Sequence, residues 1–172
     1  RFYHKTTSKF NPLFNGEEAL RYGLFDITLN HNDNYWLRLP VDPYILPEAY
    51  ASEEAATNEF FDRAKDKAIL TVQKHSMLIK GEQRNNQIAR AYLLLGKARY
   101  YNGKYLQAIE AFTYLVKNMS GNDLAVEAEL WRSKSYLALG QHDRAARELI
   151  NIAFSGGLNN EQYAKRDRNE DE

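Results

Sequence analysis

Apolar residues recur along the second half of the chain at the spacing of one helix face. In residues 105–116 they follow the steps i, i+3, i+4, i+7, i+10 and i+11, which place every member on one side of an α-helix. The same spacing returns 37 residues later (142 − 105 = 37), with His142 in the place of Tyr105. The two stripes are Tyr105, Ala108, Ile109, Phe112, Leu115 and Val116, and His142, Ala145, Ala146, Leu149, Ile152 and Ala153. This pattern predicts two amphipathic helices related by an internal repeat.

The segment before each stripe repeats at the same interval. The corresponding pairs are Ala91 and Ala128, Leu93 and Leu130, Gly96 and Ser133, Lys97 and Lys134, and Gly103 and Gly140. Small residues such as Gly96 and Ser133 permit close helix approach, and a glycine at the junction permits the positive φ of a tight turn. Two helical hairpins are therefore predicted, at residues 89–122 and 126–157.

These hairpins resemble the tetratricopeptide repeat, a helix–turn–helix unit of about 34 residues. Residues of the expected type stand at its offsets in both units: Tyr92, Leu95, Gly96, Ala108 and Phe112, then Tyr136, Ala145 and Leu149. The period of 37 residues, rather than 34, indicates a slightly longer connection between the two units, around residues 118–123. Arg99 and Arg132 replace a Tyr and a Leu of the pattern, and neither unit has its terminal Pro.

Upstream, the pattern predicts more helices and one extended connector. Residues 51–83 are expected to form a long helix, regular from Ala55 to Met77, and residues 1–30 a first helix pair that turns at Asn15–Gly16. The first helix of that pair should end or kink before Pro12. Three prolines make residues 31–50 extended, and residues 158–172 form a charged tail. The expected fold is thus all-α: a tetratricopeptide-like helical-hairpin solenoid, one domain over residues 1–172, with a Pro-containing extended segment after the first pair.

Composition narrows the classes of function. The chain has 172 residues and equal numbers of basic and acidic side chains (23 − 23 = 0), which argues against nucleic-acid binding. It has no Cys, so disulfides and thiolate metal sites are excluded. No apolar run approaches the ~20 residues of a membrane helix. The start at Arg1 lacks the apolar stretch of a signal peptide, so we expect a fragment of a longer protein with any lipid anchor outside this chain.

No catalytic or metal-binding motif is present. The four His residues form no HxxxH or HExxH pair, and Asn102-Gly103-Lys104 lacks both the first Gly and the final Ser or Thr of a phosphate loop. The abundant carboxylates are expected to lie on solvated helix faces. We therefore expect a protein that is not an enzyme and that has no cofactor and no metal.

The first helix of each hairpin in a repeat array faces the concave surface, which makes its exposed positions candidates for partner binding. The candidate partner-binding residues are Arg90, Leu93, Lys97, Tyr100 and Tyr101 in the first unit and Leu130, Lys134 and Leu137 in the second, beside Glu127 and Ala138. Lys97 and Lys134, one repeat apart, suit a carboxylate or a peptide terminus. The alternative is an ordinary solvated face. Likewise, Tyr35-Trp36-Leu37 is either a clamp on the chain's own helices or a strip that faces a partner.

Several segments together resemble one particular family. They are Tyr3–Asn11, Phe14–Leu20, Asn34–Val41, Lys74–Met77 and Ala89–Tyr101. The set resembles the N-terminal region of the PorW/SprE-type tetratricopeptide lipoproteins of Bacteroidota. That resemblance implies a scaffold on the periplasmic side of the outer membrane, which serves type IX protein secretion and gliding motility. Its implied partners are the periplasmic ring and the outer-membrane translocon.

A second class of function fits the same helices. Nutrient-uptake lipoproteins of the outer membrane also place tetratricopeptide helices beside a glycan site, so a substrate-capture module is the alternative. Sugar sites favour exposed aromatic platforms, and the chain offers two Trp residues, Trp36 and Trp131.

Overall fold

The computed structural model describes residues 12–31, 35–36, 58–79, 82–119 and 124–154. Its named helices are α2 (Phe14–Asn30), α3 (Glu59–His75), α4 (Gln87–Tyr101), α5 (Tyr105–Asn118) and α6 (Leu124–Ala138). A further helix covers residues 142–154. The all-α class is therefore confirmed for the described residues. Most of the predicted connector (31–50), the charged tail (158–172) and residues 1–11 lie outside them.

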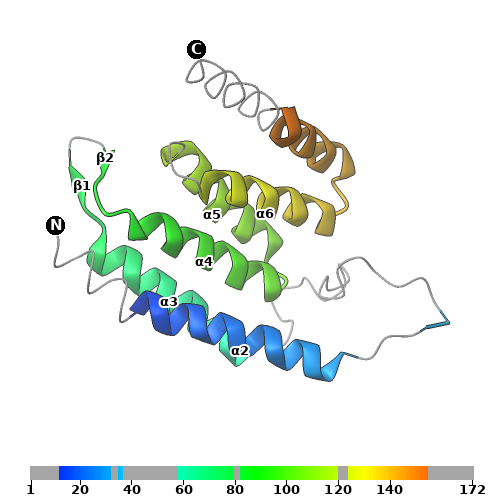
Figure 1. The fold of residues 1–172 in the computed structure, drawn as a ribbon, viewed down its shortest axis with the longest axis horizontal. Helices are drawn as coiled ribbons and strands as arrows, with labels where there is room; N and C mark the ends of the chain where they lie inside the picture. The colour runs from blue at the N-terminus through cyan, green and yellow to red at the C-terminus, as the bar shows by residue number, and fades with distance from the viewer. Residues whose placement is uncertain (1–11, 32–34, 37–57, 80–81, 120–123, 155–172) are drawn as a thin grey trace, which may run out of the picture.

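Helices that follow one another in the chain pack against one another. Contacts join α2 to α3, α3 to α4, α4 to α5 and α5 to α6, and smaller contacts join α2 to α4 and α4 to α6. Figure 1 shows α2, α4 and α6 side by side toward the viewer, with α3 and α5 behind them. This arrangement is compatible with a solenoid of helical hairpins.

The two predicted hairpin turns are confirmed in matching detail. Gly103 and Gly140 both have positive φ, at 72° and 70°. In the first turn the N–H groups of Gly103 and Lys104 donate to the carbonyls of Tyr100 and Arg99, at 2.9 and 2.8 Å. In the second, Gly140 and Gln141 repeat this 37 residues later, at 3.0 and 2.9 Å. The positive φ ends each helix, and glycine suits the position because an L side chain would be strained in that conformation.

Two clusters of buried side chains form the core. One lies among α2, α3 and α4 and contains Leu13, Ala64, Ala68, Leu94 and Ala98. The other joins α4, α5 and α6 through the predicted stripe of α5, of which Tyr105, Ala108, Phe112 and Leu115 are buried. The corresponding stripe of residues 142–154 buries Ala145, whereas Leu149 is 38% exposed. Within the described residues, the stripe of α5 is thus buried against α4 and α6, whereas its repeat is buried only in part.

The turn predicted at Asn15–Gly16 is wrong, because both residues lie inside α2. Gly16 is buried where α2 meets α3 and α4: an added Cβ would stand 2.8 Å from Leu94 Cδ2 and 3.1 Å from Lys67 Cβ. The glycine is needed for close helix packing rather than for a turn. Pro12 and Leu13 are π-helical and lead directly into α2, so the chain is already helical at the proline.

The helix predicted over residues 51–83 is shorter than expected at both ends, and it begins only at Glu59 because Asn58 is extended with ψ 127°. It ends at His75, where the Asn85 side chain donates 3.0 Å to the His75 carbonyl, and Ser76 is extended with ψ 132°. Strands β1 (Leu78–Ile79) and β2 (Glu82–Gln83) then form an antiparallel ladder that the sequence did not reveal. Gln83 Oε1 accepts the Met77 N–H at 2.8 Å, so polar side chains take over the hydrogen bonds that further helix would have made.

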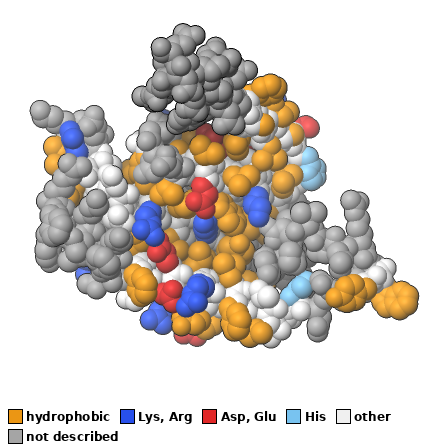
Figure 2. Space-filling model, in the orientation of Figure 1, with side chains coloured by type: hydrophobic (Ala, Val, Ile, Leu, Met, Phe, Trp, Pro, Cys, Tyr) orange, Lys and Arg blue, Asp and Glu red, His pale blue; other side chains and the backbone are white. Residues whose placement is uncertain are grey.

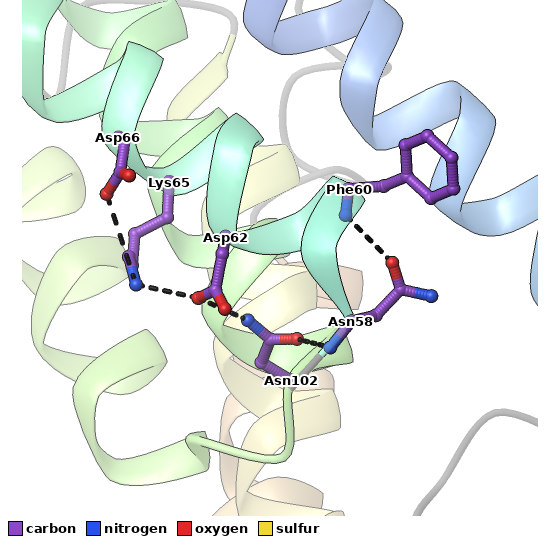
Figure 3. A network of polar contacts seen from close by, with 6 residues as sticks. All are labelled: Asn58, Phe60, Asp62, Lys65, Asp66 and Asn102. Carbon is purple, nitrogen blue, oxygen red and sulfur yellow. Dashed lines mark hydrogen bonds and ion pairs between the residues drawn. The ribbon is translucent and has the colours of Figure 1, made fainter. Parts of the chain in front are cut away.

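A polar network fixes the end of α4 to the start of α3 (Figure 3). The buried Asn102 side chain accepts the Asn58 N–H at 3.2 Å and donates to Asp62 Oδ1 at 3.2 Å. Asn58 caps α3 by accepting the Phe60 N–H at 2.9 Å and also donates to Asp26 of α2 at 3.2 Å. Three helices are thereby held in one relative position.

Candidate functional site

A groove of about 250 Å³ runs between helices α2, α4 and α6. It draws side chains from α2, α4 and α6: Glu17 and Leu20, then Arg90, Leu93, Leu94 and Lys97, then Leu124 and Glu127. Residues from three separate helices thus line one surface. The groove forms because α2, α4 and α6 lie side by side.

Two ion pairs cross the groove. Arg90 Nη2 lies 2.8 Å from Glu17 Oε1 and joins α4 to α2. Lys97 Nζ lies 2.6 Å from Glu127 Oε1 and joins α4 to α6. Their side chains are between 21% and 40% exposed, so water screens each pair and its net contribution to stability is about 0–1 kcal/mol. Because each ion pair is this weak, its charged groups can pair with charged groups of a partner instead.

Leucines occupy the space between these charges. Leu20, Leu93, Leu94 and Leu124 contribute apolar lining to the groove. In Figure 2 the same face shows basic and acidic side chains alternating over α2, α4 and α6 among hydrophobic ones. Apolar floor with flanking charges is the composition expected of a surface that recognises a peptide segment.

Trp131 of α6 forms the adjoining wall. The ammonium groups of Lys97 and Lys134 lie 5.2 and 4.8 Å from its ring centroid, within cation–π range. Tyr100 and Tyr101 contact the same ring edge-on, at centroid distances of 5.3 and 5.7 Å. Lys97 and Lys134, which occupy equivalent positions one repeat apart, therefore both lie against this indole ring.

The structure places the predicted partner-binding residues in four different settings, of which the packed Tyr100 and Tyr101 are described below. Arg90, Leu93 and Lys97 line the groove together. Leu130 and Leu137 are 44% and 40% exposed on α6, where their spacing of seven residues puts them on one face beyond the groove lining. Lys134 lies beside Trp131, as described above.

Tyr100 was expected to contact a partner, and this expectation needs correction. Its side chain is 1% exposed because Tyr105 and Trp131 pack against it edge-on. Tyr101 is half-buried and stacks on Phe61 of α3, with ring centroids 5.4 Å apart. Leu93 is only 7% exposed and offers little area. The two tyrosines pack against Trp131 and belong to the interior of the fold.

Sequence reasoning missed the contribution of α2. Glu17 and Leu20 were not among the candidates, because the turn predicted at Asn15–Gly16 assigned them to the second helix of the first pair, whereas only first helices were expected to face the concave surface. The signal that could have found them is the run of small residues Gly16, Ala19 and Gly23, which marks the packed face of α2. Leu124 was missed because it lies before the predicted start of the second hairpin at residue 126.

No converging catalytic pair stands out in the described ranges. They contain no group of three or more His, Asp or Glu side chains that could hold a metal ion. Two pKa values shift for reasons of packing: burial, with the neighbouring Tyr114, raises the pKa of Tyr92 to about 12, and burial lowers the pKa of Arg99. Both groups lie between α4 and α5, away from the groove.

Tyr35 and Trp36 are the described part of the aromatic strip. Their side chains are 80% and 96% exposed. Such exposure favours the interpretation of a strip that faces a partner over that of a clamp on the chain's own helices. Leu37 lies outside the described residues.

Comparison with known proteins does not assign this chain to a family. No protein-family model matches it, and a search of curated proteins finds no match. Among the described helices none combines the length and apolar character needed to cross a bilayer. What the fold and groove define is a class: an all-helical protein whose hairpins present a continuous, mixed apolar and charged surface.

Proposed function

We propose that this chain is a non-catalytic, tetratricopeptide-like scaffold that binds a segment of a partner protein along the face of α2, α4 and α6. The observation that carries the proposal is the groove to which all three helices contribute side chains. Its leucine floor suits an apolar anchor on the partner, while Arg90 and Lys97 suit flanking carboxylates. The helix turns at Gly103 and Gly140 and the period of 37 residues support the repeat assignment.

The cellular setting of the scaffold follows from the sequence resemblance alone. On that basis the protein acts on the periplasmic side of the outer membrane and links the periplasmic ring to the outer-membrane translocon of type IX secretion and gliding. The same resemblance implies attachment to the membrane through a lipid anchor. No nucleic acid takes part.

Calorimetry with purified ring and translocon components tests both parts of the proposal. Leu124→Asp places a charge in the groove lining, and Leu106→Asp places the same charge on α5, at a side chain that is 66% exposed outside the groove. We expect the first variant to lose binding and the second to retain it. Binding that resists both substitutions would refute the groove, and absence of binding by the unmodified chain would refute the envelope assignment.

A glycan-capture module remains the alternative because Trp36 is exposed as a sugar platform would be. The other Trp favours it less, since Trp131 is packed against Tyr100, Tyr101 and Phe112. Titration with outer-membrane oligosaccharides while Trp fluorescence is followed distinguishes the two functions. A fluorescence change lost in Trp36→Ala would favour glycan capture.

A further inference from the structure

Helix α2 has a second apolar face that the groove does not use. Large side chains recur on it, and each is more than half exposed: Phe14 (53%), Tyr22 (52%), Phe25 (61%) and Leu29 (67%). At 100° per residue these four positions fall within roughly 80° of one another. The buried residues Gly16, Ala19 and Gly23 lie on the opposite side. The helix is therefore apolar on both sides, and only one side is packed against α3 and α4.

Phe60 of α3 extends this aromatic face. Its ring lies 6.3 Å from that of Tyr22, and its side chain is 38% exposed. From fractional exposures and full areas of ~150–250 Å² for each aromatic ring, the face offers on the order of 500 Å² of apolar side-chain surface. An apolar patch of this size on a monomer is often a binding surface.

One ion pair crosses the face at its middle. Arg21 Nη2 lies 2.7 Å from Glu18 Oε2, and the Arg21 guanidinium lies 5.2 Å from the Tyr22 ring centroid. The face is thus neutral, with one acid and one base a single turn apart. A strongly charged partner would gain nothing from such a surface, whereas an identical surface turned by 180° would meet it with complementary charge.

We propose that this face, Phe14, Glu18, Arg21, Tyr22, Phe25, Leu29 and Phe60, binds a second copy of the chain with the two α2 helices antiparallel. A twofold axis between residues 21 and 22 sets Phe14 opposite Leu29 of the second copy (14 + 29 = 43). The same register sets Glu18 opposite Phe25, one helical turn from Arg21 of the second copy. The ion pair within each chain then becomes a network across the interface, flanked by aromatic contacts on both sides.

The size of the face predicts a reversible dimer. Two copies bury on the order of 1,000 Å² together, at the lower limit of specific interfaces and below the ~1,600 Å² of a standard one. Association is therefore expected at micromolar rather than nanomolar concentration. The groove stays open in this dimer, because its lining residues on α2, Glu17 and Leu20, are not part of the aromatic face.

Analytical ultracentrifugation over a concentration series tests the proposal. The unmodified chain should pass from monomer to dimer, and Phe25→Glu should weaken the association at least tenfold. Leu106→Glu, at a side chain 66% exposed on α5, is the matched control and should leave it unchanged. Circular dichroism confirms that each variant is folded. A chain that stays monomeric, or a Phe25→Glu variant that behaves like the control, overturns the proposal and leaves the face to a different protein.

A mixing experiment tests the antiparallel register. Glu18→Arg makes the middle of the face doubly basic and Arg21→Glu makes it doubly acidic, so each variant alone should dimerise less than the unmodified chain. An equimolar mixture should regain association as heterodimers, because opposite charges then meet across the axis. Failure of the mixture to exceed either variant alone would overturn the register and with it the proposed interface.

Discussion

Gly96 of α4 lies directly against the ring of Phe112 of α5: a Cβ added to the glycine would stand 2.3 Å from Phe112 Cε1. Phe112 is fully buried, so the ring has no room to move away. The closeness of the two helices in this hairpin therefore depends on the absence of a side chain at residue 96. Overpacking of a filled core typically costs ~1–3 kcal/mol, and a large side chain costs more.

The substitution Gly96→Leu is accordingly expected to be among the most destabilising in the chain. Denaturant unfolding followed by circular dichroism measures the change in the free energy of unfolding. Phe112→Ala supplies the matched test, since it removes the ring that blocks the new side chain. The double variant should be more stable than the sum of the two single effects predicts. Strict additivity would show that the two residues are not in contact.

Asn102 offers a second test, because its amide serves as both donor and acceptor. Asn102→Asp replaces the donor that faces Asp62 with a carboxylate, while Asn58 keeps its acceptor. Two carboxylates then meet at a partly buried position, and we expect a loss of about 1–3 kcal/mol at neutral pH. The loss should shrink in acid, where one carboxylate is protonated. Asn86→Asp, at the exposed N-cap of α4, is the control and should not lose stability, because a carboxylate is favourable at a helix N-terminus.

The sequence predicted the hairpin of α4 and α5 well because every local signal there agrees. The stripe from Tyr105 to Val116, the small Gly96 and the turn glycine Gly103 all specify the same two helices, and burial confirms them. The second hairpin was equally regular in pattern, yet Leu149 is exposed. Periodicity shows which face of a helix is apolar, but not whether another element covers it.

The glycine at residue 16 shows why α2 and its part of the groove were harder to predict. An Asn-Gly pair is a strong turn signal, and here tertiary contacts with Leu94 and Lys67 override it. The ion pair between Glu17 and Arg90 joins residues 73 positions apart, a relationship that no local pattern contains. Tyr100 illustrates the reverse error, since its position on the helix suited the concave face while its ring packs inward against Trp131.

Tyr92 provides a prediction for alkaline pH. Burial, together with the adjacent Tyr114, raises its pKa to about 12 from the usual value near 10, so the folded chain holds this proton more tightly than the unfolded chain. The folded state then binds more protons than the unfolded state between these two values, and stability falls as pH rises through that range. Titration of tyrosinate absorbance should show a late component that disappears in Tyr92→Phe. Its persistence in that variant would assign the late component to another tyrosine.

The groove ion pair between Lys97 and Glu127 can be used to separate a role in recognition from a role in the fold. Lys97→Glu sets two carboxylates against each other, and the double variant Lys97→Glu, Glu127→Lys restores an opposite-charge pair between α4 and α6. Because the pair is partly exposed, we expect the single variant to lose no more than about 1 kcal/mol of stability and the double variant to regain it. Thermal unfolding measures both.

Binding of the partner components should respond differently from stability. If Lys97 meets a carboxylate of the partner, the double variant places Glu there and stays weak in binding, although its fold is restored. The weakening should diminish at high salt, since screening reduces the repulsion between like charges. Leu124→Asp should remain defective at every salt concentration, because it disturbs the apolar floor. If the double variant recovers full affinity, the ion pair serves only to hold α4 against α6, and the contact with the partner must come from the leucines and the exposed face of Leu130 and Leu137.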